Sequence, residues 1–306
     1  MEVTKSKSKG LSAMAKREER WAWLFILPPF VGFCIFMAYP IVFAVTASFS
    51  RWTGLNSLLG NMAGLRNYHD ILTDTKFWKS MLNTIIYMIG IPIGMILSIL
   101  ISMGINRLKK LGRIFTTLYY IPVVSSLVAV SILWAWVFNF DYGLLNSIIK
   151  ALTGLHGPNW LGDEKMVKVA MIIFMTWKGL GGTIILYLAG LQNIPKDYYE
   201  AAKIDGATGF QLFKYITLPL ISPITFFVLI TSLIGGWQVF VEVQVMTGNG
   251  GTNYCAATIV FYLYQKAFSQ NQLGYGCAVA VILAIIIFII TAINFGTQNK
   301  WVKTMD

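Results

Sequence analysis

The sequence predicts an all-α integral membrane protein with six transmembrane helices and both termini in the cytoplasm. Three observations carry this prediction: the composition, six long apolar stretches, and an uneven distribution of lysine and arginine. Of the 306 residues, 56% are hydrophobic and only 12% are charged, whereas about 25% of a typical soluble domain is charged. The composition therefore argues against a soluble enzyme, a nucleic-acid-binding domain and a disordered chain. The net charge of +11 falls in short runs between apolar segments and forms no single basic stripe.

Six stretches reach the length of about 20 apolar residues that a membrane-spanning helix needs. They are Trp21–Ser48, Met81–Ile105, Ile114–Phe138, Met166–Leu191, Ile216–Met246 and Leu273–Phe295. The first follows the basic run KREER, as a signal peptide would. It exceeds the apolar region of about 7–15 residues found in signal peptides, so we interpret it as an uncleaved span. The three cysteines fit small core residues, because they form neither a disulfide framework nor a CxxC metal pair.

Lysine and arginine set the expected orientation. The N-terminus, the loops after the second and fourth stretches, and the C-terminus together hold 15 of these residues, and the opposite side holds 7. Lys168 and Lys178 lie within the fourth stretch and count for neither side. Because cytoplasmic segments are enriched in lysine and arginine, both termini are expected in the cytoplasm.

Proline and glycine interrupt several of the stretches. The interrupting residues are Pro92, Pro122, Pro219, Pro223, Gly179, Gly181, Gly182, Gly235 and Gly236. Two interpretations remain open at each position: a broken helix beside a water-filled cavity, as in transporters, or close helix packing through small residues. Taken as a set, these interruptions favour a cavity.

The loop between the fourth and fifth stretches, Asn193 to Pro219, has signals for two short helices. Pro195 suits a first helical turn, and Asp197 is an acidic residue close to that turn. Gly206 can end the first helix in a left-handed conformation. Thr208 and Gln211 have the spacing of a capping box for a second helix that leads into the membrane.

The spacing EAAKIDG (residues 200–206), nine residues, then ITLP (residues 216–219) resembles the EAA loop of ABC importer membrane subunits. Five further segments are similar to the carbohydrate-uptake branch of this family, the relatives of the maltose permease subunit. They are Trp23–Phe49, Gly64–Thr84, Asp141–Asn146, Asn159–Asp163 and Tyr187–Ala202. One departure is Gly251, which stands where this branch often has proline.

The resemblance implies the type I ABC importer fold. Residues 1–75 would form the cytoplasmic N-terminus, the first transmembrane helix and the first external loop. Residues 76–306 would form the permease core, with the coupling loop at about 193–219. The implied location is the bacterial or archaeal cytoplasmic membrane, crossed several times.

The resemblance also implies partners. These are a second, related permease in a heterodimer, two cytoplasmic ATPase subunits that bind ATP and Mg, and an external solute-binding protein that delivers sugar. The chain has one EAA loop and no GxxxxGK[ST] loop, so we expect it to need the second permease and to have no ATPase site or cofactor of its own.

The resemblance assigns two groups of residues. The ATPase-coupling residues are Glu200, Ala201, Ala202, Asp205 and Gly206: Glu200 would meet a basic residue, the alanines would allow close docking, and Gly206 would give the turn. The substrate-pathway residues are Trp177, Gly179, Gly182, Trp237 and Gln238. The tryptophans would stack on sugar rings and Gln238 would bind hydroxyls, although tryptophans also mark membrane interfaces.

No catalytic residues and no metal ligands are expected. His69 and His156 are expected in external loops and lack an HExxH context. Glu242 is the only acidic residue deep in an apolar stretch, and it fits a functional carboxylate or an interfacial anchor equally well.

Other functions remain open. The substrate could be a glycerol phosphate ester, for which only Lys178 offers a cation in the expected cavity. A membrane enzyme or an uncoupled channel is the alternative from another class, and the EAA loop argues against both.

Overall fold

The computed structural model describes residues 13–108 and 111–303. In these ranges the chain is helical and has no β-strand, only an isolated bridge between Ser50 and Met62. The all-α prediction is thus confirmed. Several of the counted lysines, Lys5, Lys7, Lys9, Lys109 and Lys110, lie outside the described residues.

The α-helices have the following bounds: α1 Ala13–Phe33, α2 Tyr39–Ser48, α3 Arg66–Thr73, α4 Thr75–Tyr87, α5 Gly90–Arg107, α6 Leu111–Val124, α7 Leu127–Val137, α8 Leu144–Thr153, α9 Met166–Gln192, α10 Lys196–Ile204, α11 Gly209–Leu212, α12 Leu218–Leu220, α13 Ser222–Trp237, α14 Val241–Thr247, α15 Ile259–Tyr264 and α16 Leu273–Thr297. The π-helical turns are η1 Cys34–Ala38, η3 Phe213–Thr217 and η5 Gln265–Ser269. The 3₁₀ turns are η2 Leu59–Asn61, η4 Thr252–Tyr254 and η6 Gln298–Lys300.

Four helical segments of the described chain are long and apolar enough to cross a membrane: Arg17–Ser48, Thr75–Arg107, Met166–Gln192 and Leu273–Lys300. Two bent pairs also qualify if each pair counts as one span. The α6–α7 pair bends by 100°, and Gly209–Leu220 bends by 63° against α13. The structure therefore has four to six candidate spans.

The third expected stretch is not one straight helix. The chain turns at Ser125 and Ser126, three residues after Pro122, which lies inside α6. Proline removes a backbone N–H from the helical ladder and weakens it locally. The Ser125 hydroxyl then donates to the Ile121 carbonyl at 2.8 Å, which satisfies a carbonyl near the end of α6.

The fifth expected stretch, Ile216–Met246, is not one helix in the structure. Helix α13 ends at Trp237, residues 238–240 are not helical, and α14 is a separate helix. The carbonyl of Val239 in this break accepts a hydrogen bond from the Thr258 hydroxyl at 2.6 Å. The sequence stays largely apolar across the break, so hydropathy alone does not reveal where α13 ends.

The second expected stretch is broken near its start. Helix α4 ends at Tyr87 and α5 begins at Gly90, with Pro92 in the first turn of α5. A first-turn proline costs little there, because its missing N–H has no intrahelical partner. Proline thus marks where the new helix begins.

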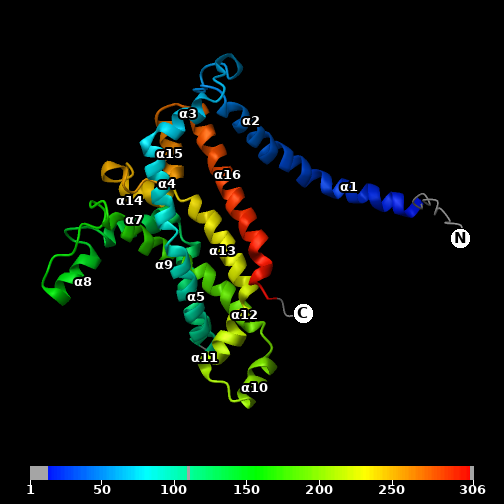
Figure 1. Cartoon of the computed structure of the whole chain (residues 1–306), viewed down its shortest axis with the longest axis vertical. Helices are drawn as coiled ribbons and strands as arrows, with labels where there is room; N and C mark the ends of the chain where they lie inside the picture. Colours follow the sequence, from blue (N-terminus) through cyan, green and yellow to red (C-terminus); the bar gives the residue numbers. More distant parts are fainter. Residues whose placement is uncertain (1–12, 109–110, 304–306) are drawn as a thin grey trace.

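The helices form a bundle with functional loops at opposite ends (Figure 1). Helices α5 and α9 pack along each other, and α13 and α16 lie beside them. Helices α3, α14 and α15 lie at the upper end of Figure 1, and α10 and α11 lie at the lower end. Helix α1 projects away from the bundle, whereas α2 packs against α16. Only 6% of the apolar window in Arg17–Ser48 is buried.

One local expectation, on His69, needs correction, and another, that the cysteines are small core residues, is confirmed for Cys255. His69 lies on α3 and not in a loop, although its side chain is 77% exposed. Cys255, in a polar stretch of sequence, is fully buried beside Ala256 and Ala257 in a core cluster. All three cysteines are free.

At the upper end of the bundle, Asp74 connects α4 to α15 and to η5. It is the N-cap of α4, and its carboxylate accepts hydrogen bonds from the Lys76 backbone N–H and the Tyr262 hydroxyl, both at 2.8 Å. The Lys266 ammonium lies 3.3 Å away, and both charged side chains are about four-fifths buried. The carboxylate therefore ties α4 to α15 and η5.

The pKa of the Asp74 carboxyl makes this tie depend on pH. Burial by itself raises the pKa, but the hydrogen bonds from Tyr262 and Lys76 and the Lys266 charge outweigh it, so the pKa lies below its ordinary value. A lowered folded-state pKa stabilises the fold above the ordinary value of about 3.9, and the gain is lost as pH falls through the folded value.

We expect Asp74→Asn to lower the free energy of unfolding at neutral pH by about 1–3 kcal/mol, because bonds to a charged group are lost. The difference from wild type should shrink as the pH falls below about 3.9 and through the lowered pKa of Asp74, where the folded wild type becomes protonated. Thermal unfolding of both purified proteins in detergent across this range measures it. A difference that stays constant down to the lowest pH would contradict the assignment.

Candidate functional site

A cavity of about 400 Å³ opens beside the α4–α5 junction, between α9, α13 and the start of α14. Its lining is rich in glycines (Gly90, Gly94, Gly179, Gly182, Gly235 and Gly236), hydroxyls (Thr176, Thr183 and Ser232) and methionines (Met88, Met95 and Met175). Lys178 and Glu242 add one charge of each sign. Small, flexible and polar groups give a hollow that an elongated polar solute could enter.

The glycines divide into two kinds. A Cβ added at Gly179, Gly182 or Gly235 would meet no atom within 4 Å, so these positions face open space. A Cβ at Gly181 would lie 2.1 Å from the backbone oxygen of Tyr119, and one at Gly90 would lie 2.8 Å from the Thr176 hydroxyl. Both interpretations of the glycine clusters therefore hold, cavity at some positions and close helix packing at others.

Hydroxyl groups fasten α5 to α9, two helices that meet at the cavity. Ser98 and Thr183 hydroxyls are hydrogen-bonded at 2.5 Å. The Ser102 hydroxyl donates to the Ile184 carbonyl at 3.0 Å. These polar contacts between apolar helices fix one wall of the cavity at its lower part.

The structure brings two of the five expected pathway residues to the cavity. Gly179 and Gly182 line it, and Trp177, Trp237 and Gln238 do not. Trp177 is 37% exposed and lies against Trp134, with ring centroids 5.1 Å apart. Gln238 is exposed at the break after α13.

Trp237 is only 4% exposed and belongs to a core cluster with Phe77, Tyr262 and Leu283. Its indole N–H has no hydrogen-bond partner within the described chain. This conformation places the ring among α4, α15 and α16 and not in the hollow. Stacking of Trp177 and Trp237 on a sugar stays a prediction that this arrangement does not favour.

Sequence reasoning overlooked the contribution of the α4–α5 junction. Met88, Ile91 and Met95 come from this segment and line the cavity. The glycine pair four residues apart, Gly90 and Gly94, was the available signal, because that spacing puts both on one helix face. Of the residues in this segment, only Pro92 was considered from the sequence, as an interruption of the helix.

The lower loop folds as its sequence predicts. Gly206 has φ +81°, and the Ala207 and Gly206 N–H groups donate to the carbonyls of Ala202 and Lys203 at 2.9 and 3.0 Å. These two bonds are a Schellman ending of α10. The capping box of Thr208 and Gln211 is also present. Pro195 precedes the helix as its N-cap, one residue before the expected place.

The predicted coupling residues lie together on this exposed loop. Glu200, Ala201, Asp205 and Gly206 are exposed, and Ala202 is half-buried. Ala202, Asp205 and Gly206 border a hollow of about 250 Å³ that Tyr215 and Ile216 complete. Ile204 and Phe210 beside it are 88% and 72% exposed. A charged, well-capped loop that also exposes large apolar side chains is suited to contact a partner surface.

The loop is fixed to the bundle at its base. The Tyr199 and Thr217 hydroxyls are hydrogen-bonded at 3.0 Å, which joins α10 to η3. Ile194 is 5% exposed and packs in a core cluster with Tyr187 and Ile221. The loop therefore connects the end of α9 to the start of α12 with little slack.

Comparison with known proteins identifies the class. Residues 90–299 match the family model of the binding-protein-dependent transport system inner membrane component. The chain belongs to this family.

Two relatives cover most of the chain. It is 33% identical over 287 residues to the arabinooligosaccharides transport system permease protein AraP of Bacillus subtilis, covering 91% of this chain and 88% of the relative. It is 34% identical over 283 residues to the lactose transport system permease protein LacF of Rhizobium radiobacter, covering 91% and 94%.

The fold is that of a solved bacterial ABC transporter involved in import of the acidic polysaccharide alginate. The TM-score is 0.81, with 22% identity, over 94% of this chain and 98% of the matched chain. A second structure of the alginate transporter, in complex with a pentasaccharide-bound periplasmic protein, gives a TM-score of 0.82 at 22% identity. The type I importer architecture expected from the sequence agrees with this likeness of fold.

Adjacent glycines on α9 test the division between packing and cavity. We expect Gly181→Ala to lower the free energy of unfolding by about 1–3 kcal/mol, because the added methyl overlaps the Tyr119 backbone. Gly182→Ala, whose methyl faces open space, should leave it unchanged or raise it by up to about 1 kcal/mol. Thermal unfolding in detergent compares the two, and equal effects would refute the division.

Proposed function

We propose that this chain is one of two membrane-spanning permease subunits of an ATP-driven ABC importer. It translocates a sugar or oligosaccharide that an external solute-binding protein delivers. The observation that carries the proposal is the exposed α10–α11 loop with the EAA spacing, which lies at one end of the bundle below a mostly apolar cavity that contains Lys178 and Glu242. A second, different permease supplies the other half of the pathway.

In this importer two ATPase subunits bind ATP and Mg, and this chain has neither an ATPase site nor a cofactor. Glu200 meets a basic residue of an ATPase, Ala201 and Ala202 allow close approach, and the turn at Asp205 and Gly206 shapes the docking hollow. ATP-driven closure of the ATPases moves the loop and rocks the permeases between inward- and outward-open states.

An uncharged carbohydrate fits the cavity better than a phosphate ester. The relatives AraP and LacF are named for arabino-oligosaccharide and lactose transport. Lys178 is a cation in the cavity, but the carboxylate of Glu242 in the same lining offsets its charge. A glycerol phosphate site would call for an excess of positive charge.

The excess of lysine and arginine in the two terminal segments and in the loops after α5 and α9 supports a cytoplasmic location for both termini and for α10–α11, in a bacterium or archaeon. The loop and helix between α7 and α9 then face outward. Arg107, at the end of α5, and Lys150, on α8, are both exposed. The proposed orientation puts them on opposite sides of the membrane, so chemical labelling at these two positions tests it.

With Cys34, Cys255 and Cys277 replaced, we expect Lys150→Cys to react with an impermeant maleimide in intact cells. Arg107→Cys should react only after the membrane is permeabilised, because it faces the cytoplasm. Asn146 on the same helix as Lys150 is unsuitable, since it is only 3% exposed. The reverse labelling pattern would overturn the orientation.

The coupling loop gives a second test. A partly desolvated charge pair loses about 2–5 kcal/mol when one partner is removed, so Glu200→Ala should weaken ATPase co-purification. Gly206→Val should abolish transport, because a β-branched residue resists the left-handed conformation of the turn. Co-purification and sugar uptake with ATP turnover in liposomes are the measurements.

Gly209→Val is the matched control. Gly209 lies three residues on in the same loop, is not among the positive-φ glycines and has open space at its Cβ. It should retain far more transport than Gly206→Val. Wild-type docking and transport in both Glu200→Ala and Gly206→Val would remove the loop from the mechanism.

A further inference from the structure

The cavity contains two charged side chains that the fold does not otherwise use. Lys178 lies near the middle of the 27-residue α9, and Glu242 lies in the first turn of α14. Within the described ranges neither takes part in an ion pair. A charged group at such a depth in a membrane protein is costly and is retained where it faces a cavity or a pathway.

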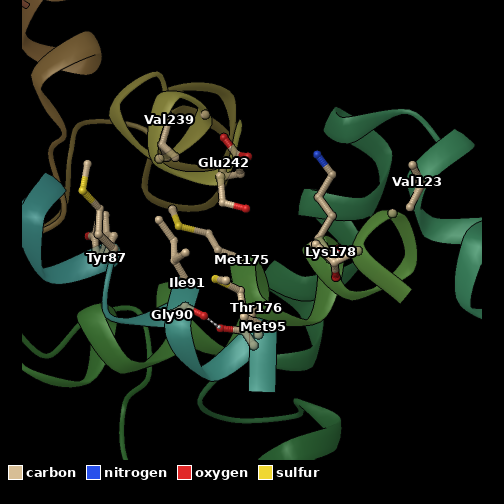
Figure 2. Close-up of a pocket in the computed structure, with 18 residues that line it drawn as sticks. Tyr87, Gly90, Ile91, Met95, Val123, Met175, Thr176, Lys178, Val239 and Glu242 are labelled. Carbon is tan, nitrogen blue, oxygen red and sulfur yellow. Dashed lines mark hydrogen bonds between the residues drawn. The ribbon is translucent and has the colours of Figure 1, made fainter. Parts of the chain in front are cut away.

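The geometry directs both groups at the same space. Figure 2 shows the Lys178 ammonium and the Glu242 carboxylate pointing into one hollow from different helices, with no hydrogen bond drawn between them. Glu242 as a whole residue is only 9% exposed, and its side chain is among those that line the hollow. Gly179, Gly182 and Gly235 leave the neighbouring space free.

We propose that Lys178 and Glu242 act together as a charge filter that selects an uncharged, hydroxyl-rich solute in the cavity. This role rests on the proposed importer function and names the substrate class of that same cavity. The two residues would touch the solute and determine specificity.

The chemistry of the two groups suits a neutral sugar. An ammonium only donates hydrogen bonds and a carboxylate only accepts them, whereas each sugar hydroxyl can do both. One neutral sugar can therefore satisfy both charges at once. An anionic sugar drawn to Lys178 is repelled by Glu242, and a cation drawn to Glu242 is repelled by Lys178, more strongly than in water because the cavity is partly desolvated.

The proposal predicts that the two charges depend on each other. Glu242→Gln leaves a net positive cavity and a lysine without a counter-charge. Lys178→Met leaves a net negative cavity. The exchange Lys178→Glu with Glu242→Lys restores the balance with both hydrogen-bonding types present, although their positions are reversed.

The experiment uses the whole complex, with its partner permease, ATPases and binding protein, in ATP-loaded proteoliposomes. Uptake of labelled neutral trisaccharides (arabinotriose, raffinose and maltotriose) is measured with and without excess tri-galacturonate. The binding protein is the same in every arm, so differences arise in this chain. Co-purification of the partner subunits shows that each variant assembles. Lys168→Met, on α9 but outside the cavity lining, is the matched control.

For the imported neutral trisaccharide, each single variant should lose about tenfold to a hundredfold in uptake, the range for lost hydrogen bonds to charged groups. The exchanged double variant should recover much of this loss. Tri-galacturonate should inhibit Glu242→Gln but not wild type or Lys168→Met.

Wild-type import of a neutral trisaccharide with unchanged rates in both assembled single variants would overturn the charge filter and leave the importer function standing. An exchanged double variant as slow as the single variants would also overturn it. A wild-type complex that imports none of the neutral sugars would instead overturn the proposed sugar function, and the filter with it.

Discussion

The structure depends on one constraint: a backbone N–H or carbonyl freed inside a membrane must find another polar partner. The helices break or bend near residues 88–89, 125–126, 221 and 238–240. Near each of these places a hydroxyl side chain donates to a backbone carbonyl: Thr176 to Gly90, Ser125 to Ile121, Ser222 to Pro219 and Thr258 to Val239. The break at residues 238–240 lies at the cavity, because Gly236 before it, Val239 in it and Glu242 after it all line the hollow.

Local features could be predicted from the sequence because neighbouring residues determine them. The left-handed Gly206 and the capping box of Thr208 and Gln211 each need only a few residues of context, and both are present. The conformation of Gly251 also has a local cause: its φ is +77°, which proline cannot adopt because its ring holds φ near −65°. The residue that departs from the family pattern thus has a backbone conformation that proline could not adopt.

Features set by tertiary packing could not be predicted. Hydropathy does not distinguish Trp237 buried against Phe77 from Trp237 facing a cavity, because both environments suit an aromatic ring. The identical glycines at 181 and 182 differ only in what α6 places opposite them. Lys178 and Glu242 are more than sixty residues apart in sequence, and only the folded chain brings them to one hollow.

The same packing connects the two ends of the bundle. The α10–α11 loop joins the C-terminal end of α9 to the start of the α12–α13 segment, and both helices line the cavity, through Thr183 on α9 and Ser232 on α13. At 1.5 Å per residue, Thr183 lies about 15 Å along α9 from the loop, and Ser232 lies about 15 Å along α13 from the 63° bend that separates α13 from α12. The Tyr199–Thr217 hydrogen bond joins α10, which follows α9, to η3, which precedes α12. In the proposed importer, a displacement of the loop would therefore reach the cavity by two routes: through α9, which is hydrogen-bonded to α5, and through α12 and the bend into α13.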